Sequence, residues 1–418
     1  CESFYKLGPA FEEMVESLLP IGHDPDESAA PGTNPSSLPP LTCIISDLFL
    51  YFTQDIAKKY GLKYVAFWTA SAGMLATTMS VVAHGHRAPP PDHEHVQEPL
   101  ITWIPGVPPL KRSEINEFLL NPDPEDLMYD IYHTSYKRLR EATCIVINTL
   151  EELEAEPLAA LRKDNEPVEV YSVGPLLPDS YLNHASERTE KTGDGGHHHT
   201  VVAGLQSYPM AALWKEDDKC VEWLNRQDPG SVLYVSFGSI TIMSGEQFEE
   251  LAMGLDGSGS PVLWVIRPDL MAGSGGQANF PDGFLERTKD RVFIVQWAPQ
   301  LQVLTHPSVG GFLTHCGWNS TLESISAGVP TLGWPYFADQ MLNNRCLVDK
   351  WGLGLEFERG DHVIVRRDEV ARKVRMLMIR NDGEDLPAQH KASAIGWQEA
   401  AQVAVHTLNG SSNVGFAH

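Results

Sequence analysis

Short apolar runs alternate with segments of helical spacing along the chain, and this alternation limits the fold more than any other feature. An apolar run at 43–47 is followed by helical spacing over 51–60 and by a second apolar run at 64–69. A further buried strand is expected at 144–148. Continuous apolar strands separated by helices are typical of parallel sheets that carry helices on both faces. The sequence therefore predicts an α/β fold.

The second half of the chain repeats this alternation more regularly. Strands are expected at 232–236, 262–266, 292–295, 311–314 and 331–334, and helices at 246–255, 300–305, 319–327, 339–350 and 369–379. The helix at 319–327 is followed by Gly328 and Pro330, which are common stop signals. This pattern predicts a second doubly wound, Rossmann-like sheet.

The length of 418 residues suggests two or three domains. A largely polar stretch at 178–215, dense in glycine near its middle, is expected to be a linker. We therefore expect an amino-terminal domain over 1–177 and a carboxyl-terminal domain over 216–395. A last helix within 396–418 is expected to pack back on the first domain.

The charge balance argues against several classes of partner. The chain has 31 Lys and Arg against 55 Asp and Glu, a net charge of −24. Nucleic acids and anionic membrane surfaces both favour basic proteins, so neither is an expected partner. No apolar run reaches the roughly 18 residues that a membrane-spanning helix needs. An anionic ligand would have to be attracted by a local group of donors or positive charges, because the net negative charge of the protein repels it.

Three further patterns argue against other kinds of site. The cysteines are scattered without a CxxC pair, which indicates reduced thiols in a cytosolic protein. The histidine-rich segments at 92–95 and 197–199 lie in loops rich in Pro or Gly, so solvated loops are favoured over metal sites. No glycine fingerprint of dinucleotide binding follows a strand, which argues against an NAD oxidoreductase. The six cysteines are Cys1, Cys43, Cys144, Cys220, Cys316 and Cys346.

Within the most informative stretch, residues 297–340, residues 310–320 have the pattern of a strand, a glycine turn and a helix start. The start of a helix presents unpaired N–H groups and the positive end of the helix dipole, so it favours an anion. His315 ends the strand, and Asn319 and Ser320 add donors in the first helical turn. We interpret this turn as a site that could hold a diphosphate without a metal.

Spacing alone leaves other residues in this region open to two interpretations. Glu323 could accept hydrogen bonds from adjacent ribose hydroxyls, but residues 320–323 also fit the Ser-x-x-Glu capping box. Trp297, Trp318 and Trp334 could all be core residues, although Trp297 stands in a loop position where its ring could face a base. The pair Asp339-Gln340 opens a helix, where an acidic residue is favourable in any protein.

Residues 297–340 closely resemble the signature box of the plant UDP-dependent glycosyltransferases of small molecules (family 1). The likeness covers essentially the whole chain and includes segments 171–175, 234–239 and 263–267. It implies a GT-B fold of two facing doubly wound domains. The matching positions of the box are Trp297-Ala298-Pro299-Gln300, His315-Cys316-Gly317-Trp318-Asn319-Ser320, Glu323, Gly328-Val329-Pro330, Trp334-Pro335 and Asp339-Gln340.

The resemblance implies how a UDP-sugar would bind. Trp297 would stack on uracil, and the backbone of Ala298 would bind the edge of that base. Gln300 and Glu323 would hold the ribose hydroxyls, and a Gln at the last box position goes with glucose as the donor sugar. The remaining contacts would come from His315, Asn319, Ser320 and Ser239 to the diphosphate, from Gly317 in the same turn, and from Trp318, Asp339, Gln340 and Thr69 to the sugar.

The resemblance also implies a histidine base that an aspartate orients. Asp47, at the end of the 43–47 strand, matches that aspartate, although a strand-terminating acid in a loop would look the same. His23 and the histidines of 84–86 do not match the position of the base. We therefore expect that roughly 60–90 residues, two or three βα units of the family's amino terminus, precede this sequence. The chain as it stands is expected to be poorly stable and essentially inactive in transfer, while its second half keeps some affinity for UDP.

Together these observations predict a cytosolic enzyme that transfers glucose from UDP-glucose to a hydroxyl of a lipophilic small molecule. It would invert the anomeric configuration, act as a monomer and need no metal or other cofactor. A nucleotide-sugar-binding protein without catalysis is the alternative. The acceptor is not predicted, because its binding site in this family is built largely from variable loops of the first domain.

Overall fold

The structure is a computed structural model that divides the chain into two compact units, Cys1–Val173 and Gly174–Ala417. The division lies close to the predicted domain end at 177. Most of the predicted linker, together with the histidine-rich segments 92–95 and 197–199, lies outside the described residues. The structure describes residues 2–19, 41–84, 100–120, 127–182, 219–270, 279–358, 364–379 and 386–406.

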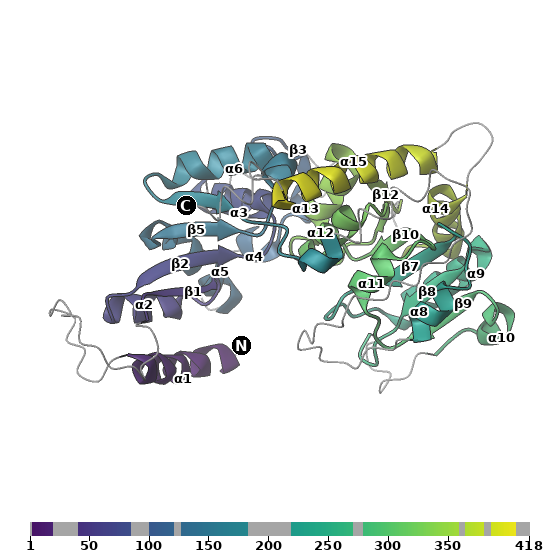
Figure 1. The fold of residues 1–418 in the computed structure, drawn as a ribbon, viewed down its shortest axis with the longest axis horizontal. Helices are drawn as coiled ribbons and strands as arrows, with labels where there is room; N and C mark the ends of the chain where they lie inside the picture. Colours follow the sequence, from purple (N-terminus) through teal and green to yellow (C-terminus); the bar gives the residue numbers. More distant parts are fainter. Residues whose placement is uncertain are drawn as a thin grey trace, which may run out of the picture. The chain divides into compact units, whose positions relative to one another are not determined.

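The first unit is built on a four-stranded parallel sheet with the strand order β1-β2-β5-β6 (Figure 1). Exposed and buried side chains largely alternate along β2, as expected for a strand with two different faces. The strands are β1 (Cys43–Asp47), β2 (Lys63–Trp68), β5 (Cys144–Ile147) and β6 (Glu169–Ser172), and a small antiparallel pair is formed by β3 (Leu100–Ile101) and β4 (Leu110–Lys111).

Helices connect the strands of this unit. They are α1 (Glu2–Leu18), α2 (Phe52–Lys59), α3 (Ala72–His84), α4 (Glu117–Leu120), α5 (Leu127–Lys137) and α6 (Glu151–Asn165), with 3-10 turns at Arg112–Glu114 and Leu139–Glu141. The start of α3 is capped by the buried carboxylate of Glu154, which accepts 2.8 Å bonds from the N–H groups of Ala72 and Gly73. This contact satisfies two donors that the first turn of a helix otherwise leaves unpaired.

The second unit is built on a six-stranded parallel sheet with the order β12-β11-β10-β7-β8-β9. The predicted α/β fold with two parallel, Rossmann-like sheets is therefore confirmed. The strands are β7 (Val232–Ser236), β8 (Val262–Val265), β9 (Val292–Val295), β10 (Val309–Thr314), β11 (Thr331–Gly333) and β12 (Gly354–Glu356). The helices are α8 (Lys219–Leu224), α9 (Gly245–Ser258), α10 (Phe284–Thr288), α11 (Gln300–Thr305), α12 (Trp318–Ala327), α13 (Gln340–Arg345), α14 (Arg367–Met378) and α15 (Leu386–His406).

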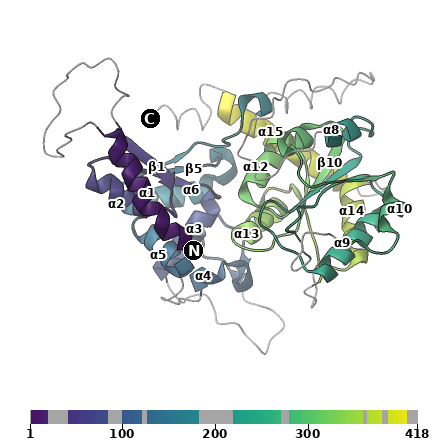
Figure 2. The same ribbon diagram turned by 90° about the horizontal axis from the view of Figure 1, so that it is seen from below.

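The two faces of this sheet bury separate cores, because side chains alternate along β7. Leu233 and Val235 pack in one core with residues of α9 and α14, whereas Tyr234 packs in the other with residues of α8 and α11. Figure 2 shows α9 and α14 on one side of the strands and α8 on the other. The alternation therefore directs the Tyr234 hydroxyl toward α11.

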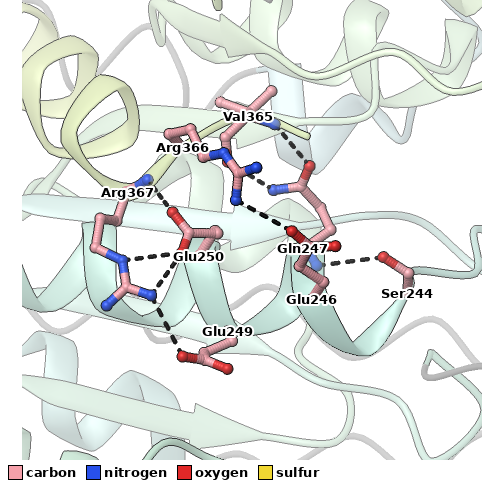
Figure 3. A network of polar contacts seen from close by, with 8 residues as sticks. All are labelled: Ser244, Glu246, Gln247, Glu249, Glu250, Val365, Arg366 and Arg367. Atoms are coloured by element: carbon pink, nitrogen blue, oxygen red, sulfur yellow. Dashed lines mark hydrogen bonds and ion pairs between the residues drawn. The ribbon is translucent and has the colours of Figure 1, made fainter. Parts of the chain in front are cut away.

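A polar network fastens the start of α14 to α9 (Figure 3). The side-chain amide of Gln247 exchanges two 2.9 Å hydrogen bonds with the backbone of Val365. Glu250 accepts from the backbone N–H of Arg367 at 2.6 Å and from its guanidinium at 2.5 Å. The side chains of Gln247 and Glu250 are buried, so losing either partner would leave a buried polar group unsatisfied.

Two helices near the carboxyl end differ from prediction. The helix expected at 339–350 begins as α13 and continues as a π-helix over Cys346–Lys350. The helix expected within 396–418 is part of α15, which begins earlier, at Leu386, and contacts α12 and α14. Its packing on the first domain stays a prediction. Residues 407–418 lie outside the described residues.

Candidate functional site

The strand order of the second unit indicates where a ligand would bind. β8 lies on one side of β7 and β10 on the other, so the order of the strands reverses between β7 and β10. Ligands of open parallel sheets bind outside the carboxyl ends of the strands at such a reversal. The loop after β7 begins with Phe237 and Gly238, and the turn after β10 contains His315, Cys316 and Gly317.

The imidazole of His315 lies between two glycines. A Cβ atom on Gly238, whose φ is +68°, would lie 2.6 Å from Cε1 and Nε2 of the ring, and one on Gly317 would lie 2.5 Å from Nε2. No larger residue fits at either position without moving the ring. Burial, helped by the charge of Arg267, lowers the pKa of His315 to about 4. The ring is therefore neutral at pH 7 and carries one N–H donor.

The turn that carries His315 is strained and is held from α13. Cys316 has a φ of +65°, a left-handed conformation that costs a non-glycine residue about 1–2 kcal/mol. The side-chain amide of Asn343 donates to the carbonyl of Cys316 at 2.9 Å and to Oδ2 of Asp339 at 2.7 Å. Asn343 thereby couples the predicted diphosphate turn to the predicted sugar carboxylate, a role that sequence reasoning missed.

Gln300 organises the predicted ribose site. Its Nε2 donates to Oε2 of Glu323 at 2.5 Å and to Oγ of Ser320 at 2.9 Å, and its Oε1 accepts from the hydroxyl of Tyr234 at 3.1 Å. Burial raises the pKa of Glu323 to about 7, against the opposing effect of the Gln300 hydrogen bond. The Oγ atom of Ser320, predicted to bind the diphosphate, accepts from Gln300 and keeps its O–H as a donor.

The capping-box interpretation of residues 320–323 is wrong. α12 begins at Trp318, its N-cap is Gly317, and no side chain caps it. Ser320 and Glu323 therefore lie inside the helix, and the Glu323 carboxylate bonds to Gln300 from α11. This arrangement removes the capping role of Glu323, and its binding of a ribose stays a prediction.

Burial separates Trp297 from the other two tryptophans of the box. Trp334 is 2% exposed and packs against Phe237 and Phe357, so it belongs to the core. Trp318 is 4% exposed. Trp297 remains partly exposed in the loop between β9 and α11, where a ring can stack on a ligand.

The predicted sugar residues stand at the start of α13. Oε1 of Gln340 accepts from the backbone N–H groups of Tyr336 at 2.9 Å and Phe337 at 3.2 Å. Its Nε2 hydrogens remain as donors, because no hydrogen bond within the described residues uses them. Burial raises the pKa of Asp339, although Asn343 donates to its carboxylate.

The two site residues predicted in the first unit contact each other. The hydroxyl of Thr69 donates to Oδ2 of Asp47 at 3.1 Å, and the backbone N–H of Phe49 donates to Oδ1 at 2.9 Å. Both residues lie at the carboxyl ends of adjacent parallel strands, β1 and β2. They form one cluster, separate in the chain from the groups around the β10–α12 turn.

Three further properties of the described part of the chain concern metals, thiols and membranes. No group of three or more His, Cys, Asp or Glu side chains there is placed to hold a metal ion. The cysteines at 43, 144, 220, 316 and 346 are free thiols. No described helix is both long enough and apolar enough to cross a membrane.

Comparisons with known proteins agree with this geometry. Residues 199–360 match the family model for UDP-glucoronosyl and UDP-glucosyl transferase. UDP-glycosyltransferase 85A1 of Arabidopsis thaliana is 38% identical over 389 residues, which are 91% of this chain and 73% of that protein. The 7-deoxyloganetin glucosyltransferase of Gardenia jasminoides is 38% identical over 390 residues, 91% of this chain and 74% of that protein.

A solved structure extends the likeness to the fold. It is that of Phytolacca americana UGT2 in complex with UDP-2fluoro-glucose and pterostilbene, with a TM-score of 0.71 and 32% identity. The match covers 90% of this chain and 74% of that one. The chain therefore belongs to the plant family 1 UDP-glycosyltransferases, enzymes of the GT-B fold that transfer a sugar from a UDP-sugar to small molecules.

Proposed function

We propose that the protein transfers glucose from UDP-glucose to a hydroxyl of a lipophilic small molecule, by one displacement that inverts the anomeric carbon and requires no metal. The observation that carries the proposal is the contact between Gln300 and Glu323 beside the turn that holds a neutral His315. The relatives give further support. One is named as a glucosyltransferase, and another was solved with a fluorinated UDP-glucose and pterostilbene.

The nucleoside would bind along α11 and α12. The partly exposed ring of Trp297 is free to stack on uracil, while Ala298 offers its backbone to the edge of the base. Glu323, when ionised, can accept hydrogen bonds from both ribose hydroxyls. Gln300 bonds to one of its oxygens, Oε2, and thereby holds the carboxylate in place.

The diphosphate would bind at the amino-terminal end of α12. This end carries unpaired N–H groups and a partial positive charge, and Gly317 lets a ligand approach the backbone closely. His315, Asn319 and Ser239 would add side-chain donors, and the hydroxyl of Ser320 would complete the group. As the bond to the anomeric carbon breaks, these fixed donors stabilise the negative charge on the leaving UDP, which is why no metal is proposed.

The remaining proposed contacts are those to the sugar and to the acceptor. Asp339 would accept from sugar hydroxyls, Gln340 would donate through Nε2, and Trp318 and Thr69 would complete the contacts. We propose that Asp47, whose carboxylate Thr69 and the Phe49 N–H hold in place, orients the histidine that removes the acceptor proton. We also propose that the protein acts as a monomer in the cytoplasm, where the free thiols would stay reduced.

The test is a transfer assay of the full-length protein with a panel of hydroxylated lipophilic acceptors and with UDP-glucose, UDP-galactose and UDP-glucuronic acid as donors. The expected product is a β-glucoside, formed equally well with EDTA, whose anomeric proton is identified by NMR. A retained α configuration or a strict requirement for Mn²⁺ or Mg²⁺ would overturn the mechanism. Tight UDP-glucose binding with no transfer to any acceptor would favour the non-catalytic alternative.

A further inference from the structure

Arg267 is a buried cation that lies behind the loop between β7 and α9. It is 2% exposed, and it follows β8, the strand next to β7. Its Nη1 donates to the carbonyl of Ser239 at 2.6 Å, and its Nη2 donates to the carbonyl of Thr241 at 2.6 Å. Its Nε is buried and has no hydrogen-bond partner in the described part of the chain.

These contacts orient the peptide groups of the loop. A trans peptide group is planar, and its N–H points opposite to its C=O. Because the carbonyls of Ser239 and Thr241 face Arg267, the N–H groups of Ile240 and Ile242 point away from it. The two carbonyl dipoles, which would repel an anion, are thereby bound to a cation.

The same loop leads directly to His315. Gly238, which precedes Ser239, lies so close to the imidazole of His315 that a Cβ would approach the ring to 2.6 Å. The positive charge of Arg267 is also felt at His315, where it adds to burial in lowering the pKa of the ring. Arg267 therefore affects the proposed diphosphate site in two ways. It positions the backbone of the β7–α9 loop, and its positive charge acts on His315.

A diphosphate is negatively charged, and the other residues of the proposed diphosphate site carry no full positive charge. The proposed ligands of the diphosphate are Ser239, His315, Asn319, Ser320 and the start of α12, and none carries a full positive charge. The chain as a whole has a net charge of −24. A buried charge acts through a lower effective dielectric than a surface charge, so its field reaches further.

One acidic residue offsets part of this charge. Oδ1 of Asp269 accepts from Nη1 of Arg267 at 2.7 Å, and its side chain is 58% exposed. Solvent screens the exposed carboxylate more than it screens the buried guanidinium. A net positive field toward the loop therefore remains.

We propose that Arg267 is a positioning residue for the donor diphosphate: it fixes the β7–α9 loop through two carbonyls and supplies the buried positive charge of this site. The proposal rests on the proposed UDP-glucose site and adds a residue that does not itself touch the ligand. It predicts selectivity between a charged nucleotide and the corresponding neutral nucleoside.

The experiment compares UDP and uridine as ligands of the full chain by titration calorimetry, with uridine measured by displacement. Arg267→Met should weaken UDP binding by roughly ten-fold, because one buried positive charge is lost behind the proposed phosphate loop. Uridine binding should change by less than about three-fold. Arg267→Lys keeps the charge but not the planar fork and should weaken UDP by an intermediate factor.

Asp269→Asn is the variant with the opposite expected sign. It removes the exposed counter-charge, leaves Arg267 intact and should strengthen UDP binding several-fold without affecting uridine. The NMR titration of His315 should move to higher pH in Arg267→Met and to lower pH in Asp269→Asn. The UDP affinity of Asp269→Asn and the titration of His315 both depend on the charge of Arg267. Neither would change in this way if Arg267 only supported the fold.

The outcomes separate the two proposals. If the wild-type chain does not bind UDP, the proposed function fails. If it binds UDP but Arg267→Met loses UDP and uridine equally, Arg267 only supports the fold and the present inference is wrong. If Arg267→Met does not fold, Asp269→Asn decides the matter, and unchanged UDP binding by that variant would contradict the inference.

Discussion

The side-chain Nε2 of Gln300 lies 2.5 Å from Oε2 of Glu323 and joins α11 to α12. The other end of the same amide accepts from the hydroxyl of Tyr234 on β7 at 3.1 Å. An amide has distinct donor and acceptor ends, so the tyrosine fixes which end faces the carboxylate. The central strand of the sheet thereby sets the geometry of the proposed ribose site.

The first prediction concerns pH. Burial raises the pKa of Glu323 to about 7, so its carboxyl is largely protonated below pH 6 in the free protein. Ribose hydroxyls donate best to the ionised form, and UDP-glucose affinity should therefore rise as pH increases through about 7. UDP-glucose is the right ligand because its phosphates do not titrate in this range. Calorimetry from pH 5.5 to 8.5 should show this rise, and Glu323→Gln should bind weakly with no such rise.

The same ionisation affects stability with a defined sign. The folded-state pKa of Glu323 lies above its ordinary value of 4.5, so the folded form binds the proton more tightly than the unfolded form. The contribution of Glu323 to stability is present below about pH 4.5 and is lost as pH rises through about 7. Glu323→Gln should therefore be more stable than wild type at pH 8 in urea unfolding. An unchanged free energy of unfolding at pH 8 would contradict the raised pKa.

The second prediction concerns Tyr234. Tyr234→Phe keeps the buried ring but removes the hydroxyl that fixes Gln300. Loss of one such hydrogen bond is expected to weaken UDP binding about five-fold, which is about 1 kcal/mol. Binding of 2′,3′-dideoxy-UDP should change little, since it lacks the hydroxyls that Glu323 would bind. Equal losses for both nucleotides would show that Tyr234 serves only the core.

The third prediction concerns the choice of sugar. Gln340→Glu keeps an oxygen for the N–H groups of Tyr336 and Phe337 but replaces the Nε2 donor with a second acceptor. We expect the preference in kcat/KM for UDP-glucose over UDP-galactose to fall while UDP binding and Tm are retained. Gln340→His should also erode the preference and should lower Tm, because it disturbs the backbone contacts. A wild-type enzyme that uses both donors equally would contradict the role of Gln340.

The fourth prediction uses two glycines with nearly the same backbone. Gly238 and Gly230 have φ values of +68° and +67°, so an alanine strains the backbone by a similar amount, about 1–2 kcal/mol. Only at Gly238 would the new Cβ meet the ring of His315, whereas nothing lies within 4 Å of a Cβ at Gly230. Gly238→Ala should lose UDP affinity at least ten-fold more than Gly230→Ala. Similar UDP affinities for the two variants would remove the argument that glycine seats His315.

The bounds of several elements of the second unit agree with the ranges expected from the sequence. β7 and β9 match the expected ranges 232–236 and 292–295, and α11 matches 300–305. β12 was not predicted, because it is a three-residue edge strand, Gly354–Glu356, with little apolar character. α1 was not predicted either, because Gly8 and Pro9 interrupt its helical pattern.

The partners of the site residues could not be predicted for a different reason. Tyr234 and Gln300 are 66 positions apart, and only the packing of α11 on one face of β7 brings them together. The contact between Arg267 and Ser239 depends likewise on β8 lying beside β7. The motif identifies residues that would touch the ligand, whereas the residues that orient them are known only from the fold.

The most direct test of the whole account is the binding of UDP-glucose to wild type, Trp297→Ala and Glu323→Ala, measured by calorimetry at pH 8. The account predicts saturable binding by wild type and a loss of about 1–3 kcal/mol when the stacking ring of Trp297 is removed. Glu323→Ala should weaken UDP-glucose far more than it weakens pyrophosphate. Binding of UDP-glucose that neither substitution changes would contradict the assignment of residues 297–340 as the donor site.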